Sequence, residues 1–160
     1  MAAMTRRRSG ARGCDGGTLS ARHQHLLYIQ RQRPPAVLER FRRLKPGEAV
    51  ISVITWGELA NGAEKSRQRD KVLALLEELA TMLPVMPLPE TAGQSYGAIR
   101  AALEAKGEEP IGNNDLWIAA HAKAARLIVV TNNEREFKRV PGLQVRNWAT
   151  TADAAHRVRA

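Results

Sequence analysis

The chain has one cysteine, few aromatic side chains and no long apolar run. Cys14 is the single cysteine among 160 residues, so an internal disulfide is excluded and no zinc site is expected. Every apolar run falls far short of the roughly 20 residues that a membrane-spanning helix needs. Arginines near the N-terminus are followed by no apolar segment, which argues against a secretory signal. These absences predict a soluble, reduced, cytoplasmic protein.

Positive charge is concentrated near the N-terminus. The formal net charge is +9, and seven arginines against one aspartate give residues 1–35 a charge of +6, which leaves +3 for the remainder. The charge therefore belongs mostly to a tail. Because the arginines have no interleaved aromatics and no recognition fold, a nucleic-acid binder that acts through a basic face is the weakest functional hypothesis.

The composition changes along the chain from tail-like to globular. Residues 1–25 are rich in Arg and Gly and almost lack large apolar side chains, so they are expected to be disordered. A single domain is expected over 26–149, followed by a short tail over 150–160. Within it, apolar β-branched segments alternate with amphipathic ones. This alternation predicts an α/β fold in which a parallel sheet is sandwiched by helices. The expected strands are 49–54, 83–88, 127–131 and 143–148, and the expected helices are 34–44, 55–66, 69–82, 90–106 and 115–125.

Acids follow the expected strands, where the sites of parallel sheets collect. Glu58 comes just after strand 49–54, Glu134 and Glu136 come just after strand 127–131, and Asp115 begins the helix that leads into the latter. Carboxylates gathered at one sheet edge repel one another, and a divalent cation would relieve that repulsion. Mg²⁺ suits such a site because it prefers oxygen ligands and a substrate phosphate, and water polarised by it can attack a phosphodiester.

Each acid also has a purely local explanation. Thr55 and Glu58 form a T-x-x-E capping box. Asp115 in a first helical turn gains about 0.3–1 kcal/mol from the helix dipole, with Asn113 or Asn114 as the N-cap. Glu134 and Glu136 lie in a polar turn of a kind that is usually just solvated. The sequence offers no phosphate-binding loop, no G-x-S-x-G and no C-x-x-C, and its histidines do not cluster.

Three motifs in order resemble the PIN-domain ribonucleases, and within them the VapC toxins of bacterial toxin–antitoxin pairs in the FitB-like subgroup. The motifs are ISVITWGELANGAEKS (51–66), IGNNDLWIAAHA (111–122) and VVTNNEREFKRVPGLQVRNW (129–148). With RQRPPAVLERF (31–41) the resemblance covers about residues 28–148. It implies a PIN-like fold and an Mg²⁺-dependent endoribonuclease, with Mn²⁺ as a substitute ion. It also implies a homodimer and a small VapB-like antitoxin that blocks cleavage of RNA.

The resemblance carries three acids over as catalytic and metal-binding residues. Glu58 is the acid of S-x-x-T-x-x-E-L, Asp115 is the metal-binding aspartate of N-D-x-x-I-A, and Glu136 is the acid of T-N-N-x-R-E-F, which assists through metal-bound water. Glu134 falls at a variable position and is not carried over.

One family element is missing. Family members begin with a strand that ends in L-D-T-N or L-D-T-S, whose aspartate is the first metal ligand, but LSARHQHLL at 19–27 has no acid. With suitable codons for Arg22–Leu27, the frame one base later encodes Asp-Thr-Ser-Ile-Cys, so a frameshift is one hypothesis. Resequencing that finds no frame for Asp-Thr there would reject it. The functional alternatives are an active ribonuclease toxin and a catalytically impaired remnant that acts only by binding its antitoxin.

Overall fold

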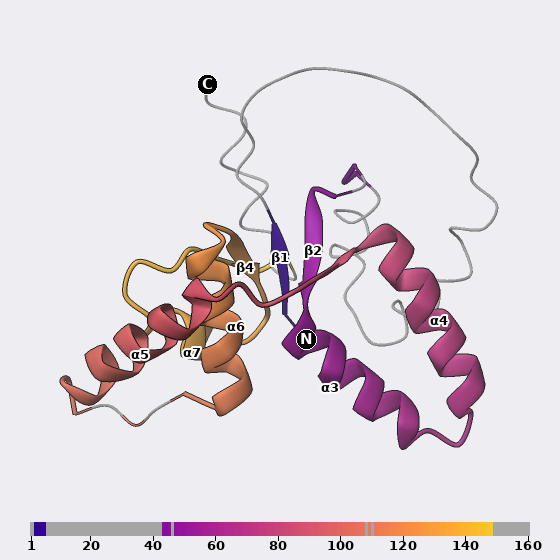
Figure 1. The fold of residues 1–160 in the computed structure, drawn as a ribbon, viewed down its shortest axis with the longest axis horizontal. Helices are drawn as coiled ribbons and strands as arrows, with labels where there is room; N and C mark the ends of the chain where they lie inside the picture. The colour runs from indigo at the N-terminus through magenta and orange to yellow at the C-terminus, as the bar shows by residue number, and fades with distance from the viewer. Residues whose placement is uncertain (1, 6–42, 46, 108, 110, 149–160) are drawn as a thin grey trace.

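The computed structural model describes residues 2–5, 43–45, 47–107, 109 and 111–148 (Figure 1). Its strands form a five-stranded sheet in the order β3-β2-β1-β4-β5. The strands are β1 (Ala3–Thr5), β2 (Ala49–Ser52), β3 (Val85–Met86), β4 (Ile128–Val130) and β5 (Val145–Arg146). The helices are α3 (Val53–Glu64), α4 (Arg69–Met82), α5 (Thr91–Glu104), α6 (Asn113–Ala124) and α7 (Glu134–Phe137). Within these described ranges no helix is long and apolar enough to cross a membrane.

Helices cover the sheet from two sides, as the alternating sequence pattern predicts. Figure 1 shows α3 and α4 on one side of the strands and α5, α6 and α7 on the other. One apolar cluster joins β2 to α3 and α4 through Ile51, Val72 and Leu76. A larger cluster joins the central strands to α5 and α6, and includes the fully buried Met4 and Leu103. The PIN-like α/β architecture is therefore confirmed.

The prediction of disorder for residues 1–25 is wrong at residues 3–5, which form the central strand of the sheet. Ala3–Thr5 form β1, in which Met4 lies opposite Val50 of β2 and Val129 of β4, antiparallel to both. Met4 is fully buried. Three small or apolar residues are enough to form this strand, because the buried backbone groups of β2 and β4 need hydrogen-bond partners between them. The prediction missed the strand because it used the composition of the whole segment. Residues 6–25 lie outside the described part of the chain, as does the helix expected at 34–44.

Two strand pairs have the predicted parallel arrangement. β2 pairs in parallel with β3, and β4 with β5, while β1 makes the sheet a mixed one. Since β1 runs opposite to β2 and β4, those two strands share a direction and end at one edge. Ala3 pairs with Val130, so the beginning of β1 lies at this same edge.

Helix starts differ from the capping predictions in two places. α3 begins directly after β2, with Ser52 as its N-cap, whose Oγ accepts the N–H of Ile54 at 3.3 Å. The proposed capping box of Thr55 and Glu58 is therefore wrong, because the helix has already started. α6 has Gly112 as its N-cap, so neither Asn113 nor Asn114 takes that role. α5 ends within two residues of the expected helix 90–106, and Gly107 beyond it has a φ of +66°.

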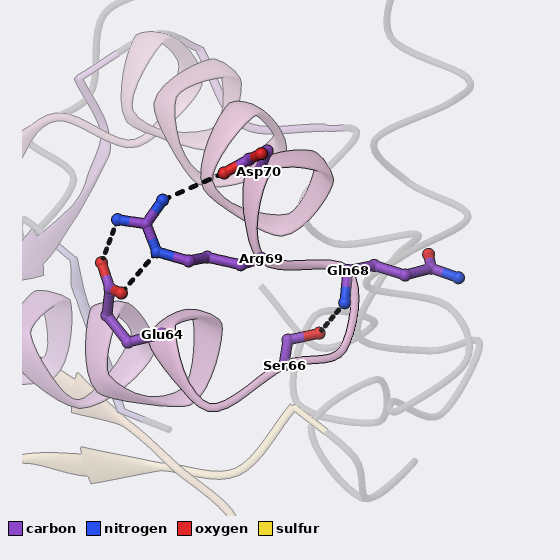
Figure 2. Close-up of polar contacts among 5 residues, drawn as sticks. All are labelled: Glu64, Ser66, Gln68, Arg69 and Asp70. Carbon is purple, nitrogen blue, oxygen red and sulfur yellow. Dashed lines mark hydrogen bonds and ion pairs between the residues drawn. The ribbon is translucent and has the colours of Figure 1, made fainter.

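The turn between α3 and α4 is held by local polar contacts. Arg69 donates to both carboxylate oxygens of Glu64 at 2.5 and 2.9 Å and to Asp70 at 3.0 Å, and Ser66 Oγ accepts the N–H of Gln68 at 3.1 Å (Figure 2). These side chains are largely exposed, so their ion pairs add little to the free energy of unfolding.

Candidate functional site

Acids from three helices lie near the sheet edge at which β2 and β4 end. Glu58 lies on α3, Asp115 in the first turn of α6 and Glu136 on α7. Both Glu58 and Glu136 act electrostatically on Asp115 and raise its pKa. The structure thus brings the three predicted site residues within electrostatic range of one of them, although they are far apart in sequence.

An amide of α6 holds the side chain of Glu58. Asn114 Nδ2 donates to Glu58 Oε1 at 2.9 Å. Both side chains are exposed, so water competes with this bond and the carboxylate keeps its second oxygen. Glu58 is therefore directed toward the start of α6, where Asp115 lies, rather than toward the start of its own helix.

A second amide holds Asp115. Asn133 Nδ2 donates to Asp115 Oδ2 at 3.0 Å, and the backbone N–H of Asn133 donates to Thr131 Oγ1 at 3.0 Å. Burial is the main cause that raises the pKa of Asp115; the Asn133 hydrogen bond and the positive N-terminus lower it, and the charges of Glu58 and Glu136 raise it. Asp115 is thus a half-buried carboxylate whose negative charge is disfavoured by its surroundings, as expected of a cation-binding group.

The two acids of α7 have different partners. Glu136 forms an ion pair with Arg139 at 2.7 Å, and the guanidinium of Arg139 also donates to the carbonyl of Glu109. Glu134 pairs with Lys138, and this hydrogen bond is the main cause that lowers the pKa of Glu134. Of these two acids, only Glu136 contributes to the raised pKa of Asp115. This distinguishes Glu136, the predicted site residue, from Glu134.

The donor set suits a magnesium ion that is held by few protein ligands. Within the residues that the structure describes, no three His, Cys, Asp or Glu side chains stand close enough to enclose a metal. Mg²⁺ does not require such a cage, since it is commonly bound by one or two carboxylates, several waters and a substrate phosphate. Asp115 and Glu58 supply hard oxygen donors of that kind.

The central strand brings no acid to this edge. Ala3 begins β1 beside Val130 at the end of β4, Ala2 directly precedes it, and both are buried. The segment 19–27, where the resemblance locates the missing aspartate, lies outside the described residues. The carboxylates available among the described residues therefore come from the helices alone.

Two asparagines of the site were missed at the sequence level as partners of acids. Asn114 precedes Asp115 directly, and Asn133 follows the strand that leads into α7. The asparagine pairs in GNND and TNNE could have indicated that amides hold the acids, because an amide near a carboxylate can donate a hydrogen bond to it. The pairing itself was not predictable, since each amide reaches an acid on a different element.

Comparison with known proteins agrees with this geometry. The PIN domain family matches residues 25–143. The chain is 38% identical over 123 residues to ribonuclease VapC2 of Haemophilus influenzae, covering 77% of this chain and 92% of that one. It is 40% identical over 123 residues, with the same coverage, to the tRNA(fMet)-specific endonuclease VapC of Shigella flexneri.

Solved structures extend the likeness to the fold. DNA-bound VapBC from Salmonella typhimurium matches with a TM-score of 0.69 at 40% identity, over 76% of this chain and 91% of that one. VapBC-1 from nontypeable Haemophilus influenzae matches with a TM-score of 0.69 at 34% identity, over 78% and 93%. The chain therefore belongs to the PIN-domain family and, within it, to the VapC ribonucleases.

Proposed function

We propose that this chain is the endoribonuclease toxin of a toxin–antitoxin pair and that it hydrolyses RNA phosphodiesters with Mg²⁺, or with Mn²⁺ as a substitute. One observation carries the proposal: helices α3, α6 and α7 carry Glu58, Asp115 and Glu136 at one sheet edge, and side-chain amides from other elements hold Glu58 and Asp115 there.

The acids have distinct roles in this proposal. Asp115 and Glu58 would hold the ion, which when bound supplies a Lewis acid for the scissile phosphate and for water. Asn133 and Asn114 orient these two carboxylates through their hydrogen bonds. Glu136, fixed by Arg139, would orient the attacking water and accept its proton.

The relatives suggest the substrate and partners. Because the Shigella flexneri relative is named a tRNA(fMet)-specific endonuclease, initiator tRNA is the first substrate to test. The VapBC complexes among the structural matches lead us to propose a small VapB-like antitoxin as the inhibitor and a homodimer as the toxin. Both partners and the RNA would meet in the cytoplasm.

Two neighbouring glutamates provide a matched test. Glu136→Gln is expected to lower the cleavage rate on the order of 100-fold, because it removes the group that accepts the proton of water. Glu134→Gln is the same change two residues away on the same helix, and it is expected to leave the rate within about twofold. EDTA should abolish cleavage in all cases. Equal losses in the two variants would show that the site is misassigned.

A second candidate function is favoured by the central strand. Since Ala2 and Ala3 stand at the sheet edge, the described part of the chain supplies no acid from β1, and the protein would then be a catalytically impaired remnant that only binds its antitoxin. Stable co-purification with the antitoxin and no Mg²⁺-dependent cleavage would support this function. Resequencing of codons 1–35 tests its cause, because a compensated frameshift would restore Asp-Thr within the segment 19–27, where the resemblance locates the missing aspartate.

A further inference from the structure

His121 is a fully buried histidine that the proposed chemistry does not use. It lies on α6, two turns beyond Asp115, and its side chain has 0% relative exposure. Its Nδ1 lies 3.0 Å from Ser52 Oγ, which is equally buried at the beginning of α3. This bond joins the helix that carries Asp115 to the helix that carries Glu58.

Ser52 Oγ takes part in two hydrogen bonds. It accepts the N–H of Ile54 at 3.3 Å and also bonds to His121 Nδ1. A hydroxyl can both donate and accept, so a neutral imidazole can make this bond in either tautomer. Burial lowers the pKa of His121, which favours the neutral ring.

The two helices are joined at two levels. Ser52 bonds to His121, and Glu58 bonds to Asn114. On the α3 side, Ser52 and Glu58 are six residues apart, which is about 9 Å at helical rise. On the α6 side, Asn114 and His121 are seven residues apart, which is about 10.5 Å. The distance between the two links is thus similar on both helices, as it must be when α3 and α6 run in opposite directions. Of the two links, Ser52–His121 is buried, whereas Glu58–Asn114 is exposed to water.

This buried link has a cost that an apolar pair would avoid. His121 Nε2 and Thr55 Oγ1 are buried without a hydrogen-bond partner among the described residues. A buried donor or acceptor without a partner costs roughly 1–3 kcal/mol, whereas replacing both members of a buried polar pair by apolar groups is often nearly neutral. Stability alone thus gives no reason for a histidine here.

From these observations we propose that His121 is a positioning residue for the nuclease site: through Ser52 it fixes α6 against α3 and so sets the separation of Asp115 and Glu58. The inference rests on the proposed function for its consequence in catalysis. Its structural content, the fixed register of the two helices, stands independently of any activity.

The kinetic test is a double-mutant cycle on RNA cleavage at saturating Mg²⁺. His121→Leu and Ser52→Ala are each expected to lower kcat about 10- to 100-fold with little change in KM, because small displacements of catalytic groups have effects of that size. The double variant should be no worse than the poorer single variant. His121→Asn, which restores a polar atom near the position of Nδ1, should recover most of the rate. Losses that multiply, or an unchanged rate in His121→Leu, would overturn the proposal.

A distance measurement tests the same claim without catalysis. Spin labels at Asn61→Cys on α3 and Asn113→Cys on α6, in a Cys14→Ser background, report the separation of the two helices near the acids. We expect a sharp dipolar spectrum with His121 or His121→Asn and a broadened or shifted one with His121→Leu. An unchanged spectrum in folded His121→Leu contradicts the positioning role. If wild type cleaves no RNA but the spectra change as expected, the proposed function fails while the register claim holds. Should His121→Leu not fold, Ser52→Ala takes its place in both assays.

Discussion

Replacing Met4 by Ala tests whether β1 forms the centre of the native sheet. Met4 is fully buried between Val50 and Val129 and belongs to the main apolar cluster. Truncating a buried Met to Ala typically costs 2–5 kcal/mol, because the transfer free energy is lost and a cavity remains. For a chain of this size each kcal/mol lowers the Tm by roughly 2–4 °C, so we expect a decrease of about 4–20 °C.

The assay is reversible urea unfolding followed by circular dichroism, with thermal unfolding as a second readout. Met82→Ala is the matched control, since Met82 is only partly buried at the end of α4 and the same truncation should cost less. A charged residue in place of Met4 should be worse than Ala, because an unpaired charge would be buried between two strands. Deletion of residues 2–5 should expose two strand edges and promote aggregation.

The opposite result would refute this description of the sheet. If Met4→Ala unfolds at the same urea concentration and temperature as wild type, then Ala3–Thr5 do not fill the space between β2 and β4. Another segment would have to pair with those strands in solution. The same result would support, for residues 2–5, the disorder that the composition of the segment predicts.

Three further outcomes follow from the contacts of the site. Asn133→Ala should lower the cleavage rate or metal affinity about 10- to 100-fold, as removal of a hydrogen bond to a metal-binding group does, and isothermal titration with Mn²⁺ measures it. Asp115→Asn should raise the Tm in EDTA, because burial and the charges of Glu58 and Glu136 disfavour the ionised carboxylate; a lower Tm would contradict that electrostatic account. The free energy of unfolding should fall as the pH drops from 7 to 5, since the pKa of His121 is lowered on folding and the unfolded chain takes up that proton first; urea titrations should show a weaker dependence in His121→Leu.

Features with a strong local signal were predictable from the sequence. β2 is apolar on both faces, and its buried pattern was confirmed. α4 and α5 were predicted within a residue or two from the amphipathic pattern of their sequences. Glu58, Asp115 and Glu136 were identified by motif, and the sheet-edge rule explains why they come near one another.

Features that depend on the tertiary structure were not predictable. β1 is too short and too close to an arginine-rich run for its composition to predict a strand; only the gap between β2 and β4 gives it a partner. Thr55 and Glu58 have the spacing of a capping box, but Ser52 starts the helix one turn earlier. His121 seemed isolated in the sequence, because Ser52, its partner, lies 69 residues away.

The most direct test of the central claim is the single-turnover cleavage of initiator tRNA as a function of Mg²⁺ concentration, for wild type and Asp115→Asn. If the acids form the nuclease site, wild type cleaves with saturable Mg²⁺ dependence. Asp115→Asn should then be slower by about 100-fold or more at every concentration, while its circular dichroism spectrum remains that of wild type. Cleavage by wild type that is unaffected by the substitution would contradict the assignment of Asp115 and with it the proposed metal site.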